Sequence, residues 1–318
     1  MKEIQVGKNE AGQRFDKLLF KYLNQAPKSF VYKMLRKKNI TLNGKKATGN
    51  EKLKELDIIK IFLADDTYNK FSSHEEKEYP TTKLDIIYED ENVLFINKPV
   101  GMLSQKAKET DVSLNEYVIG YLIESNAISK ESLESFKPSV CNRLDRNTSG
   151  LIVAGKSLIG LQTMSQMFKE RTMDKYYLCV VAGTLKENKE IDGYLYKNTQ
   201  TNKVAINHDK KGDYIRTSYI PLHTSDEITL LKVKLITGRT HQIRAHLASI
   251  GHPIIGDYKY GNKKINEQFR KLFGIKSQLL HSYILKFGQV DGSLSYLSNK
   301  EYKANTPEIF HTISKEFI

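Results

Sequence analysis

The sequence predicts an α+β protein of two domains, the larger with a mixed, largely antiparallel sheet flanked by helices. First, its 318 residues correspond to roughly two domains at about 150 residues each. Second, strand-like and helical runs follow one another without regular βαβ alternation. Third, residues 1–63 hold 15 Lys and Arg against 6 Asp and Glu, whereas the rest of the chain holds 35 against 31. This concentrated positive charge indicates a region that binds phosphates, although a solvated Lys-rich face would have the same composition.

The first region is expected to form a compact unit of short helices and strands. Apolar residues recur at helical spacing in two runs, the second of which follows Ser29 as an N-cap. Asn43-Gly44 is typical of a tight turn between strands. We therefore expect helices over residues 15–23 and 30–35 and strands over 40–42 and 58–62.

Residues 65–80 lack apolar periodicity and end in Pro80, so we expect a linker there. This divides the chain into an expected domain of residues 1–64 and a second one of residues 81–318. In the second domain we expect strands over 84–88, 93–97, 151–154, 176–182 and 230–236, and helices over 114–124, 158–168 and 240–250.

Several classes of protein are excluded by composition. No run approaches 18 apolar residues, and the first 12 residues lack the apolar segment of a secretory signal. Cys141 and Cys179 are too few for a disulfide framework, which favours a reduced, cytoplasmic compartment. No P-loop, dinucleotide fingerprint or metal cluster is present, so we expect no cofactor and no metal. His241 and His246 stand about 140° apart round a helix and would not face one ion.

The stretch NRLDRNTSG, residues 142–150, places Asp145 between Arg143 and Arg146. A carboxylate flanked by cations tends to stay ionised, as a nucleophile requires. Thr148-Ser149-Gly150 supplies turn chemistry before an apolar strand. The plainer alternative is a loop aspartate that only caps this turn.

A second stretch, residues 237–253, reads as a helix that Thr240 caps and Gly251 ends. Arg244 lies in its first turn, about 100° from the apolar stripe, and can reach a site at the helix N-terminus. In a third stretch, strand alternation places Lys175, Tyr177 and Cys179 on one face. Taken alone, Tyr177 is better explained as a core residue.

The first region resembles the S-four-type RNA-binding domain, named after a small-subunit ribosomal protein. The matching pieces are Arg14-Phe15-Asp16, the helix from Phe30 to Lys37, Leu42-Asn43-Gly44 and Asp57-Ile58-Ile59. Leu56 departs from the family, which usually has Gly before the Asp. The resemblance covers about 50 residues and implies that this domain binds RNA.

The three stretches, in this order, resemble RluA-type pseudouridine synthases over about residues 84–318. Matching segments lie at residues 97–101, 142–150, 175–177, 238–261 and 280–281. One departure is Asn142, where the family commonly has His. The resemblance implies an isomerase that converts uridine in RNA to pseudouridine without a cofactor, most often in large-subunit ribosomal RNA when an S-four-type domain precedes it.

The resemblance also implies roles for particular residues. Asp145 would be the catalytic carboxylate, paired with Arg244, and Tyr177 would stack on the uracil and relay the C5 proton. Arg143 would occupy the space that the extruded base leaves. The residues expected to contact RNA are Arg143, Arg146, Lys33, Arg36, Lys37, Lys38, Lys45, Lys46, Arg239 and His241.

RNA is the expected partner, without a membrane or a protein partner. Three alternatives stay open: a catalytically inactive RNA-binding ribosome-assembly factor, a transfer-RNA pseudouridine synthase, and an RNA hydrolase that uses Asp145 with a metal.

Overall fold

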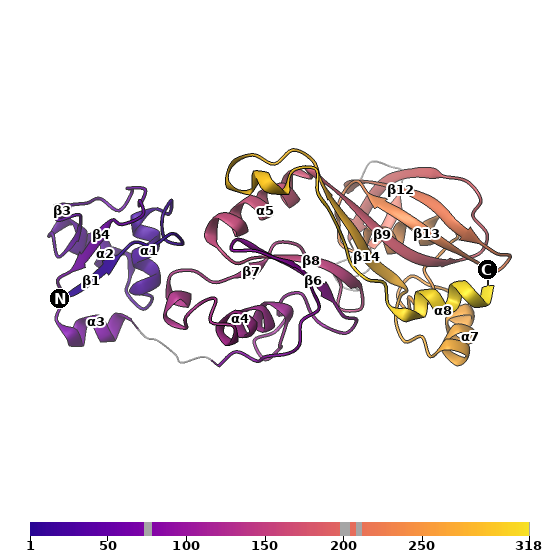
Figure 1. The fold of residues 1–318 in the computed structure, drawn as a ribbon, viewed down its shortest axis with the longest axis horizontal. Helices are drawn as coiled ribbons and strands as arrows, with labels where there is room; N and C mark the ends of the chain where they lie inside the picture. Colours follow the sequence, from indigo (N-terminus) through magenta and orange to yellow (C-terminus); the bar gives the residue numbers. More distant parts are fainter. Residues whose placement is uncertain (73–77, 198–203, 208–211, 318) are drawn as a thin grey trace.

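The computed structural model describes residues 1–72, 78–197, 204–207 and 212–317. These residues form two sheets with separate hydrophobic cores. Figure 1 shows an elongated arrangement, with the first sheet at one end and the second sheet running through the middle to the other end.

The first sheet has four strands and belongs to a unit with two helices packed on it. Its elements are β1 (Lys2–Gln5), α1 (Phe15–Tyr22), α2 (Lys28–Arg36), β2 (Ile40–Leu42), β3 (Lys45–Lys46) and β4 (Ile58–Ile61). The order is β1-β4-β2-β3, antiparallel throughout. Asn43 and Gly44 both have positive φ, 50° and 72°, as the expected tight turn between β2 and β3 requires.

Two expectations for this unit are wrong. Ser29 lies inside α2, and Pro27 holds the N-cap position, where its fixed φ precedes the helix. The expected linker begins with a helix, α3 (Asp65–Phe71), whose Tyr68 is 4% exposed in the first core. Only two apolar side chains anchor this short helix, too few to produce a visible periodicity in the sequence.

The second sheet has eleven strands in the described part of the chain. They are β5 (Ile86–Glu89), β6 (Val93–Lys98), β7 (Ser139–Val140), β8 (Ser149–Gly155), β9 (Met173–Ala182), β10 (Lys189–Lys197), β11 (Val204–Asn207), β12 (Asp213–Thr224), β13 (Ile228–Leu235), β14 (Leu280–Phe287) and β15 (Glu301–Lys303). The order is β11-β10-β12-β13-β9-β14-β8-β6-β5, with β15 on β14 and β7 on β8. All these pairs are antiparallel except β14 with β8, which confirms a mixed, largely antiparallel sheet.

Helices cover both faces of β6 and β8. The helical elements are α4 (Leu114–Glu124), the 3₁₀ helix η1 (Glu131–Glu134), α5 (Leu158–Glu170), α6 (Gln242–Ser249), α7 (Lys263–Phe273), the 3₁₀ helix η2 (Gly292–Leu297) and α8 (Glu308–Phe317). Leu94 and Ile96 of β6 pack in one core with α4, whereas Val93 and Phe95 pack in another with α5 (Figure 1). This two-sided burial explains the continuous apolar run of β6.

The two units touch through polar contacts. Asn9 accepts a hydrogen bond from the backbone N–H of Leu158, at the start of α5, over 3.1 Å. Lys21 donates to the carbonyl of Ser135 over 2.6 Å, and the hydroxyl of Ser135 donates to Glu10. Asn9 thereby satisfies one of the N–H groups that the first turn of α5 leaves free.

Candidate active site

Asp145 lies on the loop that joins β7 to β8. The hydroxyl of Ser104 holds this loop in place. It donates to the carbonyl of Leu144 over 2.8 Å and accepts from the N–H of Leu144 over 3.0 Å. Thr148 donates its N–H to the carbonyl of Asp145 over 3.0 Å. The Asp145 side chain is 29% exposed, so it is supported by the loop and still open to a substrate.

Only Thr148 of the expected Thr148-Ser149-Gly150 turn lies in a turn, which its N–H closes onto the carbonyl of Asp145. Ser149 and Gly150 instead begin β8. Gly150 has φ of 109°, and a Cβ there would lie 2.1 Å from the carbonyl oxygen of Ser282 on β14. Only glycine permits this close approach of the two strands, which brings the Asp145 loop next to β14.

Lys98 is a buried cation beneath the same loop. Its side chain is fully buried at the end of β6, and Nζ donates to the carbonyls of Pro99, Met102 and Arg146 over 2.9, 2.9 and 3.1 Å. Burial lowers the pKa of Lys98 to about 8, and the charge of Asp145 opposes this shift. Lys98 therefore ties the residue after Asp145 to the core.

Arg244 connects two carboxylates. From the first turn of α6 its Nη1 donates to Oδ2 of Asp145 over 2.7 Å, while Nε and Nη2 donate to the two oxygens of Asp257 over 2.7 and 2.9 Å. Asp257 is completely buried. Burial alone would lower the pKa of Arg244 and raise that of Asp257, but their mutual pairing reverses both shifts. The contact expected between Arg244 and Asp145 is present.

The start of α6 differs from expectation, because Thr240 is not its N-cap. His241 holds that position in the left-handed region, with φ of 55°. The Gln242 side chain accepts the hydroxyl hydrogen of Thr237 over 2.9 Å and the N–H of Arg239 over 3.1 Å. Gln242 thus organises the loop before the helix. Gly251 follows the other end with φ of 84°, as expected.

His241 and Tyr260 close one side of the site. Nε2 of His241 lies 3.8 Å from Oδ2 of Asp145, and Nδ1 lies 2.8 Å from the hydroxyl of Tyr260. Burial lowers the pKa of His241, and Arg244 lowers it further against the opposing charge of Asp145. The Arg244 guanidinium also lies 5.2 Å from the centre of the Tyr260 ring.

Tyr177 reaches the site from β9. Its side chain is 7% exposed and hydrogen-bonds with Ser282 of β14. Burial raises the pKa of Tyr177 to about 12, and the charge of Asp145 contributes to the rise. Tyr177 also packs in the main hydrophobic core, so its interpretation as a core residue is correct. The effect of the Asp145 charge on its pKa connects it to the candidate site as well.

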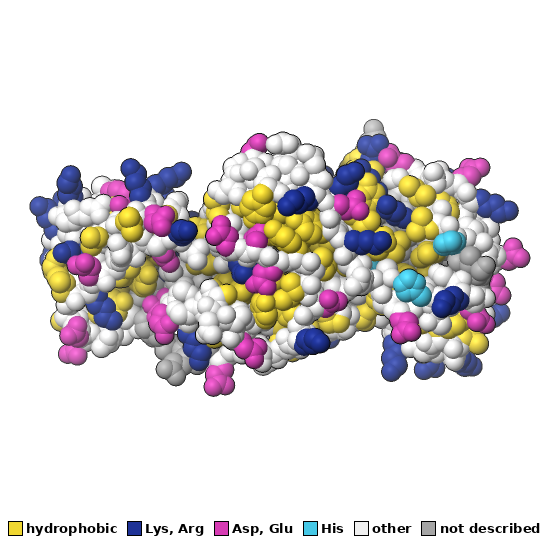
Figure 2. Space-filling view, in the orientation of Figure 1, with side chains coloured by type: hydrophobic (Ala, Val, Ile, Leu, Met, Phe, Trp, Pro, Cys, Tyr) yellow, Lys and Arg dark blue, Asp and Glu magenta, His cyan; other side chains and the backbone are white. Residues whose placement is uncertain are grey.

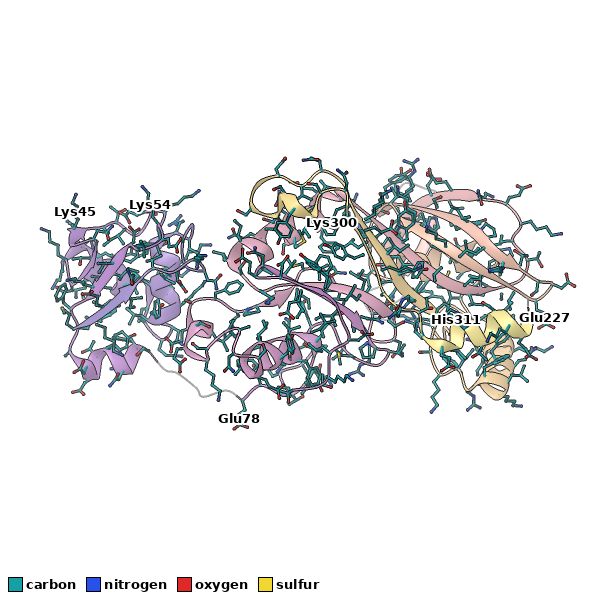
Figure 3. The ribbon with its side chains drawn as sticks, in the orientation of Figure 1. Lys45, Lys54, Glu78, Glu227, Lys300 and His311 are labelled. Atoms are coloured by element: carbon teal, nitrogen blue, oxygen red, sulfur yellow. The ribbon has the colours of Figure 1, made fainter. Side chains whose placement is uncertain are left out.

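The lysines and arginines expected to contact RNA lie on the surface. Arg143, Arg146 and Arg239 are exposed, and Arg239 forms an ion pair with Asp213 over 3.1 Å. The remaining exposed lysines and arginines of this set belong to the first unit: Lys33, Arg36, Lys37, Lys38, Lys45 and Lys46. Figures 2 and 3 show such side chains standing out from that unit, with Lys45 pointing away from it.

Asn142 points into the sheet. Its side-chain oxygen accepts the N–H of Val153 over 2.9 Å, and its amide donates to the carbonyl of Leu151 over 3.4 Å. The residue therefore continues the pairing of β7 with β8.

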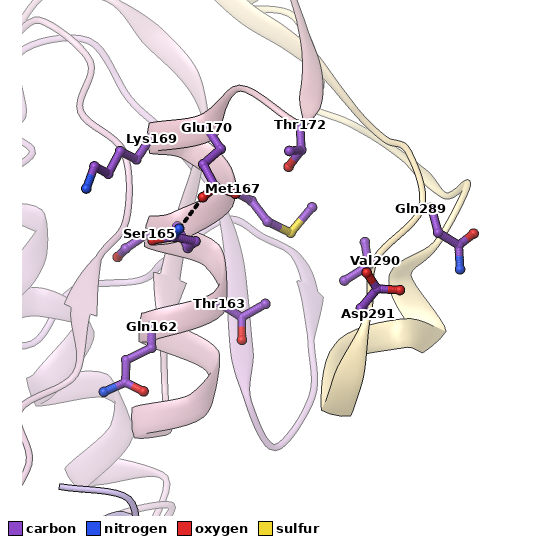
Figure 4. A pocket seen from close by; sticks show the side chains of 11 residues that line it. Gln162, Thr163, Ser165, Met167, Lys169, Glu170, Thr172, Gln289, Val290 and Asp291 are labelled. Carbon is purple, nitrogen blue, oxygen red and sulfur yellow. Dashed lines mark hydrogen bonds between the residues drawn. The ribbon is translucent and has the colours of Figure 1, made fainter.

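Lys98, Asp257 and Tyr260 were not singled out from the sequence. All three lie inside the matching segments at residues 97–101 and 238–261, which is the signal that could have found them. Within the described residues, no group of three or more His, Cys, Asp and Glu side chains is placed to hold a metal ion. A cavity of about 730 Å³ opens elsewhere, between α5 and residues 289–291, and none of the expected site residues lines it (Figure 4).

The arrangement supports carboxylate chemistry. Arg244 holds Oδ2 of Asp145, whereas Oδ1 accepts no hydrogen bond from any described residue. One oxygen is thus oriented and the other is open to attack a carbon or remove a proton. A partly exposed carboxylate held by a buried arginine is typical of an enzyme that works on an organic substrate by nucleophilic or acid–base catalysis.

Comparison with known proteins identifies the enzyme family. The sequence pattern of the family described as RNA pseudouridylate synthase matches residues 92–249. Ribosomal large subunit pseudouridine synthase C of Vibrio parahaemolyticus is 32% identical over 298 residues, 89% of this chain and 87% of that protein. An uncharacterized RNA pseudouridine synthase of Mycoplasma capricolum is 30% identical over 311 residues, 94% and 96% of the two chains. The chain belongs to the RNA pseudouridine synthase family, which confirms the resemblance to RluA-type enzymes and the prediction of an isomerase acting on RNA.

A solved structure shows the same fold. Human RNA pseudouridylate synthase domain containing 4 superimposes with a TM-score of 0.58 at 19% identity, over 72% of this chain and 92% of that one. No helix in the described ranges is both long and apolar enough to cross a membrane.

Proposed function

We propose that this enzyme converts specific uridines of large-subunit ribosomal RNA to pseudouridine. The support comes from relatives named for that substrate, which align over most of the chain, and from the basic first unit. Cys141 and Cys179 are free thiols, as is usual in a reducing compartment, so we place the enzyme in the cytoplasm.

The reaction is an isomerisation that needs no other reactant. The N1–C1′ bond of uridine breaks, the uracil turns, C5 bonds to C1′, and the proton on C5 moves to N1 through a base. Asp145 either attacks C1′ or removes the proton from C2′, and Oδ1 is the oxygen available for both. Tyr177, held neutral by burial, stacks on the uracil and relays the C5 proton.

The main structural support for this proposal is the hydrogen bond of 2.7 Å that Nη1 of Arg244 donates to Oδ2 of Asp145. The bidentate pair with Asp257 fixes the plane of the Arg244 guanidinium. The direction in which Nη1 donates to Asp145 is therefore fixed as well. Asp145 is thereby aimed before the substrate arrives, which is the preorganisation that catalysis by a single carboxylate requires.

The first unit binds RNA and the second carries out the reaction. Residues 1–72, which include α3, act as an S-four-type RNA-binding domain through the exposed basic side chains named above. The segment that follows, up to Pro80, connects this domain to residues 81–318, which form the catalytic domain. Arg143 fills the space of the flipped base, and Arg146, Arg239 and His241 contact RNA around the site.

The deciding experiment replaces Asp145 by Asn. Pseudouridines are mapped in ribosomal RNA from a strain that lacks the protein and is complemented with wild type, Asp145→Asn or the exposed control Asp226→Asn. We expect Asp226→Asn to restore the missing sites and Asp145→Asn to restore none, because the amide cannot act as a nucleophile or base. Restored modification by Asp145→Asn would overturn the assignment.

Two further readouts separate the alternatives. If no ribosomal site disappears in the deletion strain but a transfer-RNA site does, the substrate is transfer RNA. Turnover that EDTA abolishes and a divalent ion restores would favour a metal-dependent RNA enzyme. A purified wild-type protein that binds RNA without turnover would be an inactive assembly factor.

A further inference from the structure

Lys175 is a half-buried lysine on the strand that also carries Tyr177. The two side chains lie on the same face of β9, since residues i and i+2 of a strand point the same way. The Lys175 amine makes neither a hydrogen bond nor an ion pair with any residue that the structure describes. Burial lowers the pKa of its amine, and the nearby Arg171 guanidinium lowers it further.

The amine ends beside an open surface. Nζ lies 3.4 Å from the point where a Cβ would stand on Gly238, on the loop between β13 and α6. Gly238 carries no side chain to cover the amine, and both Gly238 and Arg171 are exposed. The Lys175 amine therefore lies at a surface that a ligand can reach. Neither Lys175 nor Arg171 forms an ion pair with a described acidic side chain.

Two lysines on the opposite face of the same sheet differ from Lys175, because each of the two has a partner. Lys234 of β13 forms an ion pair with Asp174 over 2.8 Å. Lys232 lies 4.7 Å from the centre of the Tyr176 ring. Burying a cation without a counter-charge is costly, so the exception on the Tyr177 face indicates that an anion arrives from outside the protein.

We propose that Lys175 and Arg171 form a phosphate subsite that holds the RNA backbone beside the uridine in the active site. Two strand residues span about 7 Å, which places the subsite one step from the base contact expected of Tyr177. The occupant is a backbone phosphate of the RNA, because the surface is open and the site is cationic. This inference rests on the proposed function, since it assumes that RNA enters along the Tyr177 face.

The test measures RNA binding apart from turnover. In an Asp145→Asn background, the affinity for a short fluorescein-labelled single-stranded RNA is followed by anisotropy through a KCl titration. We expect Lys175→Gln and the exposed Arg171→Gln each to weaken binding several-fold and to reduce the log–log salt slope by about 0.7. The matched control Lys232→Gln removes the same charge from the other face of the sheet and should leave both quantities unchanged.

A second arm identifies the phosphate. RNAs with a single neutral methylphosphonate linkage at successive positions are bound by wild type and by Lys175→Gln. At one position the neutral linkage should weaken wild-type binding and have no additional effect on Lys175→Gln. Free inorganic phosphate, at the concentrations used for RNA, should not displace the RNA from the protein.

Three results would overturn the inference. The first is an equal loss of RNA affinity in Lys175→Gln and Lys232→Gln, and the second is an unchanged salt slope in both Lys175→Gln and Arg171→Gln. The third is a methylphosphonate effect on affinity that adds to the effect of Lys175→Gln at every position of the RNA. Arg171→Gln keeps the test valid if Lys175→Gln does not fold. Absence of turnover in wild type would contradict the proposed function and leave these binding results standing.

Discussion

Arg244 makes three hydrogen bonds to two carboxylates, and the two that fix its orientation go to the buried Asp257. Asp257 is thus a positioning residue for Asp145, with which it shares no direct contact. This relationship assigns to Asp257 an effect on catalysis that acts through Arg244.

Replacement of Asp257 by Asn should therefore impair both stability and turnover. Removing one charge of a buried pair costs roughly 3–5 kcal/mol, because the other charge is left uncompensated. We expect a lower melting temperature and a fall in kcat that exceeds any change in KM. Asp213→Asn, which removes the exposed partner of Arg239, is the control and should leave both quantities close to wild type. Wild-type kcat in a folded Asp257→Asn protein would contradict the positioning role.

Tyr177→Phe separates stacking from proton relay. The ring and its packing remain, and only the hydroxyl that bonds Ser282 is lost. A relay predicts that kcat falls at least tenfold while KM stays near wild type, whereas stacking alone predicts little change in either. Because burial raises the pKa of Tyr177 to about 12, the wild-type rate should show no loss from its ionisation below about pH 11. The pH–rate profile of both proteins checks this.

Local patterns in the sequence were sufficient for many of the elements. The helix predicted over residues 114–124 has the bounds observed for α4, and in the structure Ser113 and Glu116 form a capping box at its start. The strand β2 was predicted as observed, since it is followed by the Asn43-Gly44 turn. Both features depend on residues within a few positions of each other.

The missing parts depend on contacts between distant residues. The parallel pairing of β8 with β14 joins Ser149 to His281, and no local pattern specifies it. The sequence shows that Lys98 and Asp257 are charged but not that they are fully buried, which is what makes them supports of the site. The start of α6 at His241 likewise depends on Gln242 folding back onto Thr237.

Asn142 tests the one departure from the family inside the Asp145 motif. In Asn142→Ala, the buried N–H of Val153 loses its acceptor, which costs roughly 1–3 kcal/mol. We expect lower stability and a partial loss of turnover, because the Asp145 loop follows directly. Asn142→His can still accept this hydrogen bond through a ring nitrogen and should keep most of the activity. An alanine variant as stable and active as wild type would show that the position is neutral.

Leu56→Gly should stabilise the first unit. Leu56 has φ of 71° and is 68% exposed, so its side chain strains the backbone and contributes little packing. The left-handed conformation costs a non-glycine residue roughly 1–2 kcal/mol, of which the greater freedom of unfolded glycine cancels about half. Leu56→Ala keeps the Cβ and is the control. Urea unfolding of the full chain measures the effect, and an equal gain in Leu56→Ala would show that loss of the exposed leucine, and not backbone strain, is the cause.

His281 predicts how stability responds to acid. The ring is fully buried between Ser149 and Ala304, and burial lowers its pKa from 6.5 to about 4. Between those values the unfolded chain binds a proton that the folded protein does not, so stability is complete above about pH 6.5 and is lost as the pH falls towards 4. The loss from this group is about 3 kcal/mol. Urea unfolding at a series of pH values should show a smaller acid-dependent loss in His281→Gln than in wild type, whereas the exposed His223→Gln should keep the wild-type dependence. If His281→Gln lost stability in acid as steeply as wild type, the acid sensitivity would come from other groups.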